Sequence, residues 1–177
     1  MKRIRSTSLG YDTLSLEGAL LLPDVLEKAA QGNASLQTAD DYHVPRGFTL
    51  QEEYGRAFRI AQAQWKVFSA TFDRTDLDTG VTTRGFVEEF LRDALGYTDL
   101  HRTQPIAVGE RRFPINAIAQ NVLPVVIAPH DLDLDEPASR FAPEGGGARK
   151  KTAFQLVQEF LNASPECDWG LVTNGLR

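Results

Sequence analysis

Residues 111–175 constrain the fold most, because short apolar runs alternate there with a single amphipathic helix. Two apolar runs, 113–119 and 122–128, are separated by a two-residue turn, which predicts a β-hairpin. A third run, 169–172, carries no charge and is mostly apolar, which predicts a strand in the centre of the sheet. Together these strands and the helix between them predict a small α/β core.

The helix of this core is predicted to begin after Thr152, whose hydroxyl is a good N-cap. From there apolar side chains recur at helical spacing on one face: Phe154, Val157, Phe160 and Leu161. Residues 131–150 lack this periodicity and contain three consecutive glycines, so we expect a loop. A further short strand is expected at 104–108.

The N-terminal part is predicted to be helical. A first helix is expected to start near Pro23 and to end before Gly32, followed by a loop over 33–48. Thr49 and Glu52 have the spacing of a capping box and predict the start of a long helix. Its apolar residues recur every three or four positions and predict one stripe packed in the core: Tyr54, Phe58, Ala61, Trp65, Phe68 and Phe72.

Another helix is expected after the polar segment 73–80, with Thr82 or Thr83 as its N-cap and Gly96 as its stop. The expected fold class is therefore α+β, with a helical N-terminal segment and a mixed sheet flanked by helices. We expect the domain boundary at residue 80, which gives a helical extension (1–80) and an α/β domain (81–177). The turn signal just before the last two residues suggests a piece of a longer chain.

The composition narrows the cellular setting. A net charge of -5 argues against a generally basic nucleic-acid coat, although it leaves room for a local basic face. The single cysteine, Cys167, cannot form an internal disulfide, which suits a reducing cytoplasm. No apolar signal core follows the basic start, and the run 14–23 is too short to cross a bilayer. We expect a cytoplasmic protein without a membrane partner.

From Phe86 onward the order of elements resembles the restriction-endonuclease-like, or PD-(D/E)XK, nuclease fold. In that family a helix precedes a hairpin, one strand carries an Asp after a Pro, the next carries Glu-x-Lys, and a helix with a Gln and a further strand follow. Two carboxylates hold a divalent metal, and the lysine orients or activates the attacking water. The corresponding positions here are Asn116, Ala128 and His130. The resemblance thus implies a degenerate nuclease site with no catalytic and no metal-binding residue.

More specifically, the chain is similar to the N-terminal region of the large bacterial type IIG-like restriction-modification DNA adenine methyltransferases of phage-defence systems. The resemblance implies a parent enzyme that uses S-adenosylmethionine, with the methyltransferase domain further along the same chain. The glycine-rich cofactor loop and the Asn-Pro-Pro-Tyr motif of that family do not occur in these 177 residues, so we expect no cofactor in this segment. The segments that carry the similarity are Leu14–Pro23, the helix with Trp65, Leu95–Tyr97, Phe113-Pro114, Leu132–Asp135, Val157–Asn162 and Trp169–Gly175.

Basic residues near the last helix are candidate DNA contacts. Lys150 and Lys151 precede a predicted helix N-terminus, where backbone N–H groups also favour a phosphate. Such residues bind the DNA backbone without reading its sequence, and salt weakens the contact. The alternative is that these cations belong to an ordinary charged loop. Gln155 and Gln158, on the helix that follows, are candidates for DNA contact and equally for a structural role. The candidate DNA-binding residues are Arg111, Arg112, Arg149, Lys150, Lys151, Gln155 and Gln158.

Two further features have structural explanations. The alternating aspartates of 131–135 could suggest a Ca²⁺ loop, but an EF-hand needs Gly at its sixth position and Glu at its twelfth. Those positions hold Glu136 and Ala142, so we expect a solvated turn. His130 has no second His or Cys at ligand spacing, which favours a structural role over metal binding.

Three functions remain open from the sequence. The first is a catalytically inactive domain of a DNA modification enzyme that binds DNA or serves as a scaffold for neighbouring domains. The second is an active metal-dependent DNA endonuclease with a migrated carboxylate, and the third is a protein-interaction module. Whether the parent protein cleaves as well as methylates also stays open. The candidate migrated carboxylates are Glu88, Glu89, Asp131 and Asp133.

Overall fold

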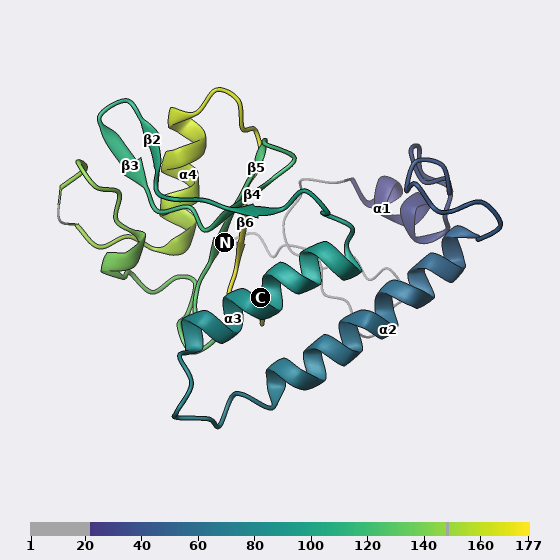
Figure 1. The fold of residues 1–177 in the computed structure, drawn as a ribbon. Coiled ribbons are helices and arrows are strands. Elements are labelled where there is room, and N and C mark those ends of the chain that lie inside the picture. Colours follow the sequence, from purple (N-terminus) through teal and green to yellow (C-terminus); the bar gives the residue numbers. More distant parts are fainter. Residues whose placement is uncertain (1–21, 148) are drawn as a thin grey trace, which may run out of the picture. The chain divides into compact units, whose positions relative to one another are not determined.

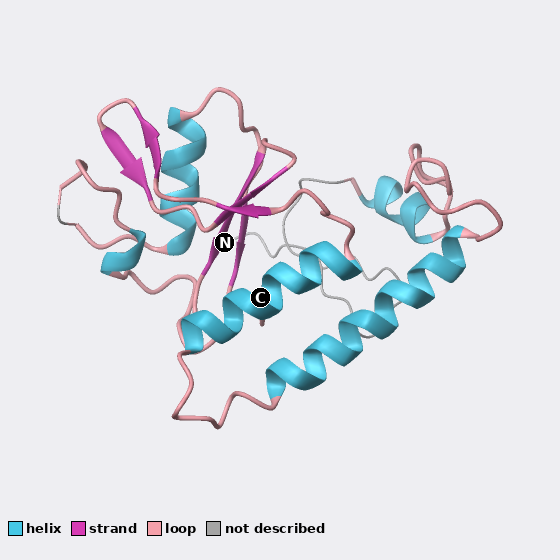
Figure 2. Ribbon diagram, in the orientation of Figure 1, coloured by secondary structure: helices cyan, strands magenta, loops and turns pink. Residues whose placement is uncertain are grey.

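The computed structural model describes residues 22–147 and 149–177 (Figure 1). Within these residues the protein is a mixed α+β structure with four α-helices and a mixed four-stranded sheet (Figure 2). This confirms the expected class. The chain forms two compact units, residues 1–54 and 55–177. The division at residue 80 stays a prediction, and the expectation for residues 14–21 lies outside the described part of the chain.

The first unit contains the helix α1 (Pro23–Ala30), which has proline in its first turn as predicted. Gly32 follows with φ of +72°, a left-handed conformation that ends helices and that glycine adopts without steric cost. Residues 33–48 consist of turns and irregular backbone. The predicted helix, its end and the loop after it are therefore confirmed.

The helix α2 (Leu50–Ser69) begins at the predicted capping box. The Thr49 backbone N–H donates to Glu52 Oε2 at 2.7 Å, and the Glu52 N–H donates to Thr49 Oγ1 at 3.3 Å. The hydrogen bond from the Thr49 backbone N–H, followed by the one from its hydroxyl, lowers the pKa of the Glu52 carboxyl. Local hydrogen bonds therefore fix where this helix starts.

Of the predicted apolar stripe, only Phe68 is fully buried, so the prediction that the stripe packs in the core is wrong for most of its residues. Phe68 is 3% exposed, whereas Phe58 is 64% and Trp65 is 42% exposed. Phe58 and Trp65 line an open apolar groove of about 540 Å³, together with Phe86 and Leu171. Helical periodicity identified the apolar face correctly but could not tell whether other residues cover it.

The helix α3 (Thr79–Glu89) begins at Asp78, whose Oδ1 accepts from the Val81 N–H at 2.8 Å. The expected cap at Thr82 or Thr83 is wrong, because both hydroxyls lie inside the helix and donate to carbonyl groups of the preceding turn. The helix continues into a π-helical turn, Phe90–Ala94, and Gly96 ends it with φ of +80°, as predicted.

The main sheet has the strand order β1-β4-β5-β6. β1 (His101–Arg102), β4 (Ala117–Ala119) and β5 (Leu123–Ile127) pair antiparallel in succession, and β6 (Leu171–Thr173) pairs parallel with β5. Within the described residues β6 has a partner on one side only, so its predicted central position is wrong. All three of its residues are half-buried, whereas four of the five residues of β5 are buried.

Two shorter strands, β2 (Ile106–Val108) and β3 (Arg111–Phe113), form a separate antiparallel ribbon. The predicted strand over 113–119 is thus split between β3 and β4. Pro114 lies in the break, and proline cannot donate a hydrogen bond to a sheet ladder. The predicted hairpin between β4 and β5 is confirmed: Gln120 and Asn121 have φ of 52° and 56°, as a two-residue turn with both central φ angles positive requires.

The sheet is covered by a helix on each face (Figure 1). Val125 and Ile127 of β5 pack in the cluster that contains residues of α3. Val126 and Ala128 pack in the cluster that contains α4 (Ala153–Ala163) and the buried Phe113. Because successive side chains of a strand point to opposite faces, β5 must be apolar at every position to fit between the two helices.

Close packing of α4 against the sheet predicts the effect of adding one methyl group. A Cβ at Gly170 would lie 2.4 Å from Val157 Cγ1 of α4. We expect Gly170→Ala to lower the free energy of unfolding by about 1–3 kcal/mol, as overpacking does. The matched control is Gly85→Ala in α3, where a Cβ meets no described atom within 4 Å. There we expect a gain of up to about 1 kcal/mol, since glycine weakens a helix interior. Urea denaturation of both variants checks this, and equal effects would contradict the packing described.

Candidate functional site

The first candidate region lies where β4 and β5 separate, and Asn116 holds it together. The Asn116 N–H donates to the Val125 carbonyl at 3.1 Å, and its side-chain Oδ1 accepts from the Ile127 N–H at 2.7 Å. The amide oxygen therefore takes the place of a backbone carbonyl just before β4 begins. Asn116 extends the sheet ladder, which is a structural role for a neutral side chain.

Ala128 lies directly after β5 and is fully buried. Its N–H donates to the Thr173 carbonyl of β6 at 2.8 Å, so the parallel pairing continues to this residue. Its methyl group packs in the apolar cluster on the α4 face, which also contains Val126 and Phe141. The position therefore offers no side-chain atom that could bind a metal or a proton.

His130 is anchored on three sides. Its N–H donates to Thr83 Oγ1 at 2.9 Å, and its Nδ1 lies 3.2 Å from the same oxygen. The ring stacks on Phe72 at a centroid distance of 4.7 Å and meets the edge of Phe68 at 5.6 Å. Thr83 also donates to the Thr79 carbonyl at 2.6 Å. Because the hydroxyl has a single proton, we assign the proton of the His130–Thr83 bond to Nδ1.

The sequence missed this arrangement, because Thr83 and His130 are 47 residues apart and Thr83 was expected to cap a helix. Thr83 is instead fully buried and connects α3 to the end of β5. A threonine inside an amphipathic helix, on its apolar side, was the available signal. Such a residue needs a partner when buried.

The candidate migrated carboxylates differ in their surroundings. Glu88 is buried, and two nitrogens of the Arg102 guanidinium donate hydrogen bonds to its carboxylate, Nε to Oε1 at 2.8 Å and Nη2 to Oε2 at 2.7 Å. The hydrogen bonds to Glu88, and then its charge, raise the pKa of the Arg102 guanidinium. Glu89, Asp131 and Asp133 are exposed. The described residues contain no cluster of three or more His, Cys, Asp or Glu placed to hold a metal ion.

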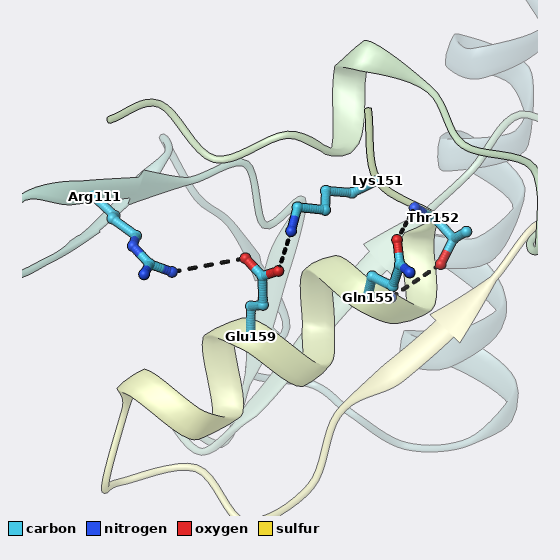
Figure 3. Close-up of polar contacts among 5 residues, drawn as sticks. All are labelled: Arg111, Lys151, Thr152, Gln155 and Glu159. Carbon is cyan, nitrogen blue, oxygen red and sulfur yellow. Dashed lines mark hydrogen bonds and ion pairs between the residues drawn. The ribbon is translucent and has the colours of Figure 1, made fainter. Parts of the chain in front are cut away.

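A basic cluster gathers beside α4 (Figure 3). The Glu159 carboxylate lies between two cations: Lys151 Nζ bonds to Oε1, and Arg111 Nη1 lies 3.7 Å from Oε2. Arg111 comes from β3, Lys151 directly precedes the N-cap Thr152, and Glu159 lies in the second turn of α4. The structure thus brings two predicted DNA contacts together around an acid that the sequence did not single out.

The two candidate glutamines differ. Gln155 closes the capping box of α4: its N–H donates to Thr152 Oγ1, and its Oε1 accepts from the Thr152 N–H, both at 3.1 Å (Figure 3). Its position is therefore explained by the helix start. Gln158 is exposed on the same helix and lines a hollow of about 450 Å³ together with Phe154 and Trp169.

Besides Arg111, three further candidate cations are exposed: Arg112, Arg149 and Lys150. Within residues 22–147 and 149–177 none of them has an ion-pair partner. Arg112 follows Arg111 in β3, so their side chains point to opposite sides of the strand. The backbone groups of Arg112 bond to Glu144, which holds the loop before α4 against the ribbon.

The chain matches no family model, and comparisons with characterised proteins and with solved structures find no match. No helix within the described part of the chain is both long and apolar enough to span a membrane. The function must therefore be inferred from the residues and their geometry.

The role of Asn116 can be tested by removing its acceptor. Asn116→Leu leaves the Ile127 N–H without its partner, and we expect the free energy of unfolding to fall by about 1–3 kcal/mol. Asn116→Asp keeps an acceptor oxygen and is expected to cost less. Chemical denaturation measures both. A leucine variant as stable as wild type would show that the bond does not hold β4 and β5 together.

Proposed function

We propose that this chain is the degenerate, restriction-endonuclease-like N-terminal region of a restriction-modification DNA methyltransferase, and that it binds duplex DNA without cutting it. The main support is the element order: α3, then the antiparallel strands β1, β4 and β5, then α4, then β6 parallel to β5. It agrees with the order of the nuclease family that the sequence resembles, a helix before a hairpin and then a second helix and strand.

The inactive character of the domain follows from three positions. Asn116 uses its amide oxygen in the sheet, Ala128 presents only a buried methyl group, and His130 is held by Thr83. Hard cations such as Mg²⁺ bind carboxylate and other oxygen ligands, usually with a charged group among them. Glu88 is a buried acid, and its charge is paired with that of Arg102. These residues support binding or scaffolding rather than hydrolysis.

DNA contact is supported by the cations that no described acid neutralises. Arg112, Arg149 and Lys150 are exposed, so each can reach a backbone phosphate and release a condensed counterion. Such contacts position the duplex and do not read bases. Under this proposal sequence recognition and S-adenosylmethionine binding belong to the methyltransferase domain of the same chain, which this domain would help to hold on DNA.

The test is a triple substitution of these three cations. For Arg112, Arg149 and Lys150 changed to Ala, we expect duplex affinity at low salt to fall by about 10-fold or more, because each cation that neutralises a phosphate contributes through counterion release. The slope of log affinity against log salt should become shallower by about 0.9 for each phosphate that is no longer neutralised. Fluorescence anisotropy with a labelled duplex measures both quantities.

The matched control changes three exposed cations of α2 and of the π-helical turn after α3 to Ala: Arg59, Lys66 and Arg92. Both variants lose the same charge, so a general electrostatic effect would weaken them equally. The proposal requires the control to bind nearly as wild type does. Equal losses in the two variants, or no binding by the wild-type protein even at low salt, would contradict the DNA-binding role.

A further inference from the structure

Arg111, Lys151 and Glu159 form a triad in which one carboxylate serves two cations (Figure 3). The side chains of Lys151 and Glu159 are 23% and 31% exposed, and that of Arg111 is 50% exposed. The triad therefore lies at the surface and is reachable from solvent. It borders a hollow of about 590 Å³ that Gly146 and Asn162 also line.

The donors of this triad are those that proteins use for phosphate. A guanidinium and an ammonium placed on either side of an anion match the oxygens of a phosphate group as well as those of a carboxylate. In the free protein that anion is Glu159, which comes from within the domain itself. The pair of cations is thus preformed, and its ligand position is filled.

We propose that Arg111 and Lys151 are a phosphate-binding pair of the DNA site, and that Glu159 occupies the phosphate position until DNA displaces it. This inference rests on the proposed DNA binding and adds its regulation. A backbone phosphate entering the pair replaces one anion by another, so the wild-type protein gains less from these two cations than from unpaired ones.

A purely structural triad makes the opposite prediction. It would tie the β2–β3 ribbon to α4, and partly exposed ion pairs of this kind contribute little to stability. Removing the carboxylate would then lower stability slightly and leave DNA affinity unchanged apart from the change of net charge. Under the proposal the same substitution raises affinity, because both cations become available to phosphate.

The experiment compares Glu159→Gln with wild type in duplex binding over a range of salt. We expect Glu159→Gln to tighten binding by about 3- to 10-fold at low salt and to steepen the salt slope by about 1, as one added phosphate contact does. Adding Arg111→Gln or Lys151→Gln to Glu159→Gln should remove that gain. Thermal denaturation of each variant shows whether it remains folded.

The matched control is Glu144→Gln, which removes one exposed negative charge next to the same ribbon and has no ion-pair partner among the described residues. It should change affinity much less than Glu159→Gln. Equal gains in the two variants, or no gain in Glu159→Gln while wild type binds, would overturn the inference and leave the proposed function standing. If neither wild type nor Glu159→Gln binds the duplex, both fail.

Discussion

The burial of β5 on both faces is the constraint on which the rest of the second unit depends. Val125 and Val126 are completely buried, one toward each helical layer, and the chain continues in the same way to Ala128. A charged side chain at the end of such a strand needs a metal or an opposite charge to offset its desolvation. An alanine needs neither, so the sheet packs fully against α4 at Ala128.

Polar groups around the end of β5 are likewise paired within the fold. The Asn116 amide oxygen satisfies the Ile127 N–H, and the Thr83 hydroxyl satisfies the His130 N–H. These polar groups thus have partners within the fold, and the buried acid Glu88 has Arg102. Among the described residues, exposed cations without an acidic partner include Arg112, Arg149 and Lys150. The paired polar groups at the end of the sheet and these exposed cations are what supports the proposed binding to a polyanion over chemistry upon it.

Local sequence signals predicted much of the fold. The capping box at Thr49, the N-cap at Thr152, the hairpin at Gln120 and the stop at Gly96 depend on residues within a few positions of one another. These features depend little on distant contacts, because their hydrogen bonds or backbone angles are satisfied locally. The predicted start of α3 was wrong because Asp78, which precedes the two threonines, accepts the Val81 N–H and caps the helix.

What the sequence could not predict depends on distant contacts. The edge position of β6 and the exposure of Phe58 and Trp65 are set by which elements are present to cover them. Periodicity does not encode that information. The Thr83–His130 bond and the triad around Glu159 join residues far apart in the chain, so no spacing rule brings them together. For the candidate site, the residue types indicated which side chains stand at positions 116, 128 and 130, and the structure was needed to show which contacts they make.

The central proposal is that this domain, which holds Asn116 and Ala128 instead of an acidic pair, binds duplex DNA without cutting it. Duplex affinity measured at fixed ionic strength, in EDTA and in Mg²⁺, tests it most directly, with the DNA recovered afterwards and examined for strand breaks. The account predicts the same affinity in both buffers and intact DNA. Binding that requires the divalent ion, or cleavage in its presence, would contradict it.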